Sequence, residues 1–223
     1  MTGVLDCLSR FTDALDLLLD SKKTFAWSTS GKGRKSLADQ GFRVATNCKL
    51  LGAHVQVSRK HTNATQTARV STLQPLWPKL KLSAAAYEVK VQAIRAAAWP
   101  RGLHAIAATT VSLQTFASLR AGAMKGLNAD GAGCNAMIHL GLLECPQTDP
   151  HFWAIYQTFR MVRDCGIEDV VHPALFALAN GDESYANNGI TATLLTRIQV
   201  FGWHVSSPHC LTDDFGSFSL FST

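Results

Sequence analysis

Apolar side chains recur at spacings of three and four residues along most of the chain, which is typical of amphipathic helices. Near the beginning, residues 4–19 carry leucines and a phenylalanine at this spacing, with acidic residues between them. From Thr62 or Asn63 a second helix is predicted, which Pro75 and Pro78 close. The same criteria predict further helices over residues 83–98, 112–125, 134–143, 149–164, 167–179 and 190–202.

Short segments with strand character interrupt this helical pattern near the N-terminus. Residues 24–29, TFAWST, are rich in β-branched and aromatic types, and residues 42–57 read as two strands in which polar and apolar side chains alternate. Between them, SGKGRK reads as a turn, followed by a helical turn that ends at Gly41. We therefore predict a mainly α fold with a small antiparallel β unit near the N-terminus, on which the helix of residues 4–19 packs. The last twenty residues read as a hairpin or two edge strands.

The helix predicted over residues 83–98 has a specific orientation. Ser83 is its expected N-cap, and Trp99-Pro100 follows its expected end. Lys90 should face outward. The side chains expected to form its buried stripe are Val89, Ala93, Ile94 and Ala97.

Charge is distributed unevenly along the chain. Residues 20–130 contain 17 lysines and arginines against four acidic residues, a net charge of +13, whereas residues 1–19 sum to −2 and residues 131–223 to −6. The charge changes sign at the glycine-rich stretch 126–133, which is the predicted boundary between segments 61–130 and 131–223. A middle segment this basic indicates a polyanionic partner such as nucleic acid, although a merely soluble basic surface gives the same tally.

Several other classes of protein or site lack support in the sequence. No apolar run approaches the roughly 18 residues of a membrane span, and no secretory signal pattern is visible. The six cysteines form no CxxC pair, which indicates reduced thiols in an intracellular protein of the nucleus or cytoplasm. GKGRKS lacks the GxxxxGK[ST] spacing of a phosphate-binding loop, and the histidines form no HExxH pair. Asp213-Asp214, in TDDFG, is interpreted as a turn rather than a metal site.

The order of motifs over residues 4–125 resembles the C-terminal palm and thumb of a reverse transcriptase from a non-LTR (LINE-like) retrotransposon. Phe11, Leu15 and Leu17 match that family's F-x(3)-L-x-L helix, and Lys23-Thr24 match the loop of motif D. KLLG, residues 49–52, stands in the place of the primer grip, with leucine where the family commonly has an aromatic residue. Basic helices then follow, with a WPRGL element at residues 99–103.

The resemblance implies specific roles. Lys23 is the candidate motif D lysine near an incoming triphosphate, where an ammonium group can neutralise charge on the leaving phosphate. The family's [YF]-x-DD box, which holds Mg²⁺ in an intact polymerase, has no counterpart in this chain. We therefore expect a polymerase fragment, inactive alone and without a cofactor of its own, that contacts a template–primer duplex without sequence preference. The candidate nucleic-acid-binding residues are Lys49, Gly52, Arg59, Lys60, Arg69, Lys79, Lys81 and Lys90.

In this interpretation, residues 1–60 are a palm remnant, residues 61–130 a basic thumb-like region, and residues 131–223 an acidic helical region ending in a hairpin. The alternative is a non-catalytic helical module that binds another protein, or an unselected remnant of a retroelement. A salt-dependent nucleic-acid binding assay separates these interpretations.

Overall fold

The computed structural model describes residues 10, 14, 25–28, 30–50, 53–56, 64–109, 111–182 and 190–219. It divides the chain into two compact units. One contains residues 1–48 and 56–60, and the other contains residues 49–55 and 61–223. The described part is mainly helical, which confirms the predicted fold class.

The described residues of the first unit are organised around helix α2, Gly31–Asp39. Ser30 caps this helix, because its hydroxyl accepts a hydrogen bond from the amide of Gly33 at 2.9 Å. The prediction of a turn over SGKGRK is therefore wrong, because the Ser30 cap starts the helix at Gly31, within this stretch. Ala26 forms an isolated parallel bridge with Val44.

Strands β1 (Asn47–Leu50) and β2 (Ala53–Gln56) form a two-stranded sheet. Ala26 pairs outside that sheet, so the single β unit predicted from residues 24–29 and 42–57 does not form as one sheet. A single bridge with Val44 satisfies the backbone of Ala26 instead. The predicted helix of residues 4–19 lies outside the described residues, apart from helical Arg10 and Ala14.

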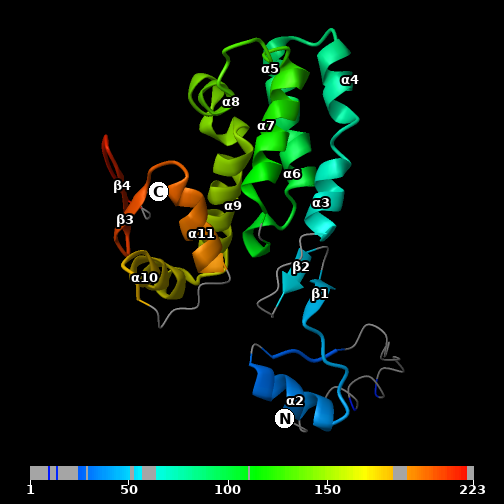
Figure 1. The fold of residues 1–223 in the computed structure, drawn as a ribbon, viewed down its shortest axis with the longest axis vertical. Coiled ribbons are helices and arrows are strands. Elements are labelled where there is room, and N and C mark those ends of the chain that lie inside the picture. Colours follow the sequence, from blue (N-terminus) through cyan, green and yellow to red (C-terminus); the bar gives the residue numbers. More distant parts are fainter. Residues whose placement is uncertain are drawn as a thin grey trace. The chain divides into compact units, whose positions relative to one another are not determined.

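The second unit begins with helices packed side by side (Figure 1). Helix α4 packs along α7, and α3 lies against α6. A π-helical segment, η1, joins α5 to α6 without a break, so the helix continues through Trp99-Pro100 instead of ending there. Pro100 has no N–H and clashes with the fourth carbonyl before it in an α-helix, and the wider π turn relieves that clash. The bounds are α3 Ala64–Ser71, α4 Leu76–Leu82, α5 Tyr87–Ala93, η1 Ile94–Ala98, α6 Trp99–Gly102, the 3₁₀ turn η2 Ile106–Ala108, and α7 Leu113–Leu127.

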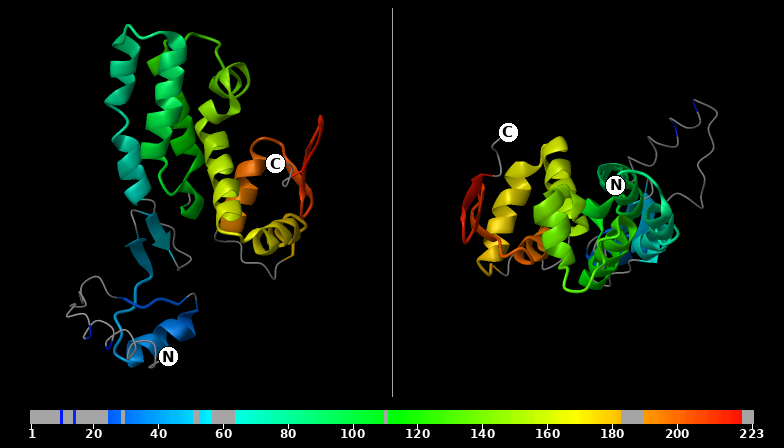
Figure 2. Two further views of the ribbon diagram at one scale, coloured as in Figure 1. Left: turned by 180° about the vertical axis from the view of Figure 1, so that it is seen from behind. Right: turned by 90° about the horizontal axis from the view of Figure 1, so that it is seen from above.

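The rest of this unit contains further helices and then a sheet. Ser112 and Asp149 are the N-caps of α7 and α9, since each side chain accepts hydrogen bonds from the first turn of its helix. Figure 2 shows the three-stranded sheet beside α10 and α11 in two further views. The bounds are α8 Ala136–Ile138, the π turn η3 His139–Glu144, the 3₁₀ turn η4 Pro146–Thr148, α9 Pro150–Asp164, α10 Glu168–Ala179, α11 Ile190–Gln199, β3 His204–Ser207, β4 Cys210–Asp213 and β5 Gly216–Ser219.

The antiparallel sheet of the described residues, in the order β3-β4-β5, lies at the C-terminal end rather than near the N-terminus as predicted. Val205 opposes Leu211 in its register, and both side chains are buried against α10 and α11. A turn joins β4 to β5, in which the Asp213 carboxylate accepts from the amides of Phe215 and Gly216 at 2.8 and 2.9 Å. This confirms the interpretation of TDDFG as a turn and explains why a sheet forms there.

Two hydrophobic clusters form the core of the second unit. The larger cluster is built from α3 to α9 around Trp77, Trp99 and Phe116, which are at most 2% exposed. The smaller cluster joins α9, α10 and α11 to the sheet, with Leu175 and Leu194 fully buried. Because the larger cluster includes side chains on both sides of residue 130, the basic and acidic segments share one core.

Candidate nucleic-acid interface

Helices α4 and α7 form the framework of the basic region in the second unit. They approach closely because α7 presents Gly122 and Gly126 to α4. A methyl group at Gly122 would lie 2.3 Å from Nε1 of Trp77, so only glycine fits there without movement of the indole ring. Gly126 also faces Leu80, whose Cβ lies 3.4 Å from the ideal Cβ position of Gly126, a close but ordinary contact. The sequence thus permits a near contact of the two helix backbones.

This contact sets the positions of three exposed lysines. Lys79 and Lys81 flank Leu80 on α4, while Lys125 precedes Gly126 on α7. Since Leu80 lies against Gly126, the three lysines are at the same level of the helix pair, near the end of α4. All three side chains are exposed, so their ammonium groups are accessible to an anionic ligand. We call this set the α4–α7 lysine cluster.

One acidic residue lies beside the cluster. Asp130 forms an ion pair with Lys81, with 3.8 Å between Oδ2 and Nζ, and both side chains are more than 40% exposed. The backbone carbonyl of Lys81 also accepts a hydrogen bond from the side-chain amide of Asn128, at 3.4 Å. An exposed pair of this kind contributes little to stability, so a phosphate group can displace the carboxylate.

The predicted binding residues fall into separate places. Lys79 and Lys81 both lie near the end of α4, in the lysine cluster. Arg69 lies on α3, where it is half-buried and donates from NH1 to the carbonyl of His104 at 3.0 Å. Lys49 lies in β1, and its side chain is outside the described set. The predicted residues outside the described part of the chain are Lys23, Gly52, Arg59 and Lys60.

The outward orientation predicted for Lys90 is wrong. Lys90 is only 6% exposed, whereas Val89, expected in the buried stripe, is 53% exposed. The stripe instead follows Val91, Ile94 and Ala98. In this alanine-rich segment two apolar stripes are available, and packing against the rest of the core decides between them. A lysine on the buried side places its aliphatic stem against the core.

Lys125 is a member of the cluster that sequence reasoning did not select. Its charge contributes to the net charge of +13 over residues 20–130, but none of the family motifs within residues 4–125 contains it. The sequence signal that could have identified Lys125 is the pair Gly122 and Gly126. Two glycines four residues apart mark the face of α7 that another helix approaches, and Lys125 is next to the second of them.

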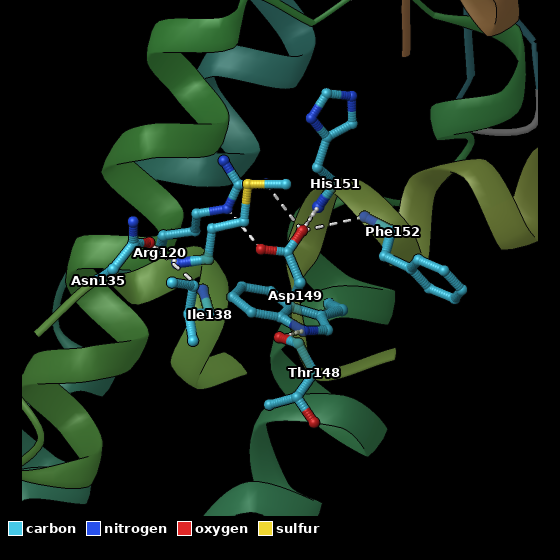
Figure 3. Close-up of polar contacts among 9 residues, drawn as sticks. Arg120, Asn135, Ile138, Thr148, Asp149, His151 and Phe152 are labelled. Atoms are coloured by element: carbon cyan, nitrogen blue, oxygen red, sulfur yellow. Dashed lines mark hydrogen bonds and ion pairs between the residues drawn. The ribbon is translucent and has the colours of Figure 1, made fainter. Parts of the chain in front are cut away.

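A buried ion pair fixes the orientation of α7 against α9 (Figure 3). The guanidinium group of Arg120 binds both carboxylate oxygens of Asp149, at 2.5 and 2.9 Å. One oxygen of Asp149 also accepts from the amides of His151 and Phe152, which caps α9. Because Asp149 is fully buried and every contact is charge-assisted, this junction ties α7 to the start of α9.

Two further buried side chains, His151 and Arg197, carry groups that can be charged. The His151 ring stacks on Phe116, with centroids 4.4 Å apart, and burial lowers the pKa of His151 to about 4, with the positive charge of Arg120 acting in the same direction. Arg197, on α11, donates to Thr158 and to the carbonyls of Ile106 and Thr109 at 2.8–3.1 Å. Burial lowers the pKa of Arg197 to about 10, so it remains charged at neutral pH. Neither side chain reaches the surface, so both serve the core.

Comparison with protein-family models, curated proteins and solved structures finds no match. The chain's own side chains therefore supply the functional argument. Within the described ranges, no three His, Cys, Asp or Glu side chains gather in the geometry of a metal site. No helix there has the length and apolar character required to cross a bilayer. Cys134, Cys145, Cys165 and Cys210 carry free thiols.

Proposed function

We propose that this chain is part of a retroelement reverse transcriptase and contacts a template–primer duplex through the α4–α7 lysine cluster. The observation that carries the proposal is the exposure of Lys79, Lys81 and Lys125 at one level of the closely packed α4–α7 helix pair. It agrees with the net charge of +13 over residues 20–130 and with the motif order over residues 4–125. Lys90 is left out of the proposed interface because its side chain is buried.

Phosphate contacts explain how such a cluster holds a duplex. Lysine ammonium groups neutralise phosphates and release the counterions condensed on the nucleic acid, and they carry no information about base sequence. Binding should therefore tolerate any sequence and weaken steeply as salt increases. The residues matched to the family do not include its carboxylate box, so the proposed role is to hold the duplex rather than to catalyse nucleotide addition.

The test is a salt titration of duplex binding by fluorescence anisotropy. A labelled RNA–DNA hybrid is titrated with the full chain and with the triple variant Lys79→Ala, Lys81→Ala, Lys125→Ala. Each lost phosphate contact lowers the slope of log K against log[salt] by about 0.9, so the triple variant should flatten it by roughly two to three units. Arg160→Ala with Arg163→Ala, exposed on α9 in the acidic segment, is the matched control and should leave the slope unchanged.

An unchanged slope in a folded triple variant would contradict the proposal. Exposed apolar side chains on α4 and α5 favour a second candidate function, a protein-interaction module. Leu82 is 85% exposed and Val89 is 53% exposed, on either side of the α4–α5 connection. Absence of duplex binding at low salt would favour this second function, because phosphate contacts are strongest under that condition.

A further inference from the structure

The π turn η3 brings two residues with metal-binding side chains together. His139 begins this turn and Glu144 ends it, five positions later. In an α-helix, residues five apart point about 140° away from each other. The i→i+5 hydrogen bonds of a π turn instead place one above the other. Here Nε2 of His139 lies 4.0 Å from Oε1 of Glu144.

Tyr87, at the start of α5, completes this group. Its hydroxyl lies 2.7 Å from Nε2 of His139, and the two rings meet edge to face with centroids 6.4 Å apart. Burial raises the pKa of Tyr87, and the negative charge of Glu144 raises it further, so the phenol remains protonated in the free protein. An imidazole nitrogen, a carboxylate oxygen and a phenol oxygen thus converge from two elements that lie far apart in the sequence.

We propose that Tyr87, His139 and Glu144 form a binding site for a divalent transition metal ion such as Zn²⁺. Imidazole nitrogen and carboxylate oxygen are ordinary zinc ligands, with bonds of about 2.0–2.2 Å. Donor atoms on a tetrahedral ion with such bonds lie roughly 3.3 Å apart. The distances from Nε2 of His139 to the Tyr87 hydroxyl, 2.7 Å, and to Oε1 of Glu144, 4.0 Å, lie on either side of this value.

The surroundings of the group favour a cation that keeps water ligands. The side chains of His139 and Glu144 are 19% and 22% exposed, so solvent reaches the donor atoms and can fill the remaining coordination positions. Tyr87 either ligates directly or holds the carboxylate in place by a hydrogen bond. An imidazole donor favours zinc, nickel or copper over Mg²⁺, which prefers oxygen ligands and water. This site is separate from the lysine cluster and independent of the proposed function.

The test uses the full chain and Zn²⁺, with affinity measured by competition against a chromophoric chelator. The wild-type chain should show saturable binding that His139→Ala and Glu144→Gln each weaken at least tenfold. Tyr87→Phe should weaken it about tenfold, as the loss of an orienting hydrogen bond does at other zinc sites. His204→Ala, an exposed histidine on β3, and Cys165→Ser, an exposed thiol just after α9, are the controls and should leave the affinity unchanged.

A second measurement keeps the proposal falsifiable if His139→Ala disturbs folding. Excess Zn²⁺ should raise the midpoint of thermal unfolding of the wild-type chain and leave that of the near-isosteric Glu144→Gln unchanged, because only an ion bound to the folded state stabilises it. Absence of saturable binding below about 1 mM Zn²⁺, or equal binding by the wild type and Glu144→Gln, would overturn the proposal. The three side chains would then be a hydrogen-bonded group that only joins α5 to η3.

Discussion

Replacing His151 with phenylalanine should protect the protein against mild acid. The His151 side chain is fully buried, stacks on Phe116, and meets Phe201 edge to face at 5.3 Å. Neither ring nitrogen has a hydrogen-bond partner. Burial lowers the pKa of His151 from 6.5 to about 4, so the folded protein holds this ring neutral where the unfolded chain would protonate it.

The sign and size of the effect follow from proton linkage. Because the unfolded state binds the proton more tightly, stability falls as the pH falls from about 6.5 to about 4, and it is unaffected by this group above pH 7. The shift corresponds to a total loss of about 3 kcal/mol, of which about 2.5 kcal/mol is already lost at pH 4.5. Since small domains are stable by roughly 5–15 kcal/mol, a loss of this size is readily measured.

Urea unfolding followed by circular dichroism at pH 7.5 and pH 4.5 is the assay. Between these two values, His151→Phe should lose about 2 to 3 kcal/mol less stability than the wild type. Its ring retains the stacking on Phe116. His172, whose pKa is also lowered by burial, titrates in both proteins, so its contribution cancels in the difference. Equal losses in the two proteins would refute the reasoning, because they would show that His151 is protonated in the folded state without cost.

Two substitutions test the framework of the lysine cluster. Gly122→Ala should destabilise the chain by about 1–3 kcal/mol in urea unfolding, because its methyl group overlaps the indole ring of Trp77. The control is Gly131→Ala, whose methyl group meets no atom within 4 Å and should have little effect. Equal stabilities of the two variants would show that the indole moves aside freely. Asp149→Asn leaves Arg120 partly buried without its carboxylate and should lower stability by about 3–5 kcal/mol, and a change below 1 kcal/mol would mean that the junction does not hold α7 to α9.

Helix positions were largely determined by local sequence. The caps at Ser112 and Asp149 are formed by side chains that bind amides two or three residues away, so no distant contact is required to place them. The turn at Asp213 is local in the same sense. For this reason the helices starting at residues 113 and 150 and the C-terminal β turn were predicted close to where they lie.

Tertiary packing decided which side of a helix is buried. Residues 83–98 offer two apolar stripes, and the core selected Val91 and Ile94, which turned Lys90 inward and left Val89 exposed. The π segments η1 and η3 also escaped prediction. Their fifth-residue bonds have no local signature in a sequence rich in alanine and leucine, and packing determines whether the wider turn is tolerated.

Both candidate sites therefore depend on contacts between distant segments. The basic charge and its place in the chain were readable from the sequence, but only the close approach of α7 to α4 at Gly126 puts Lys125 at the same level as Lys81. Tyr87 contacts His139, which lies 52 residues later in the sequence, and no spacing pattern predicts that contact. Sequence alone determined the charge of this protein and the starts of its locally capped helices, because those depend on neighbours along the chain. Only the tertiary structure decided which charged and polar groups meet, because that depends on which helix faces share a core.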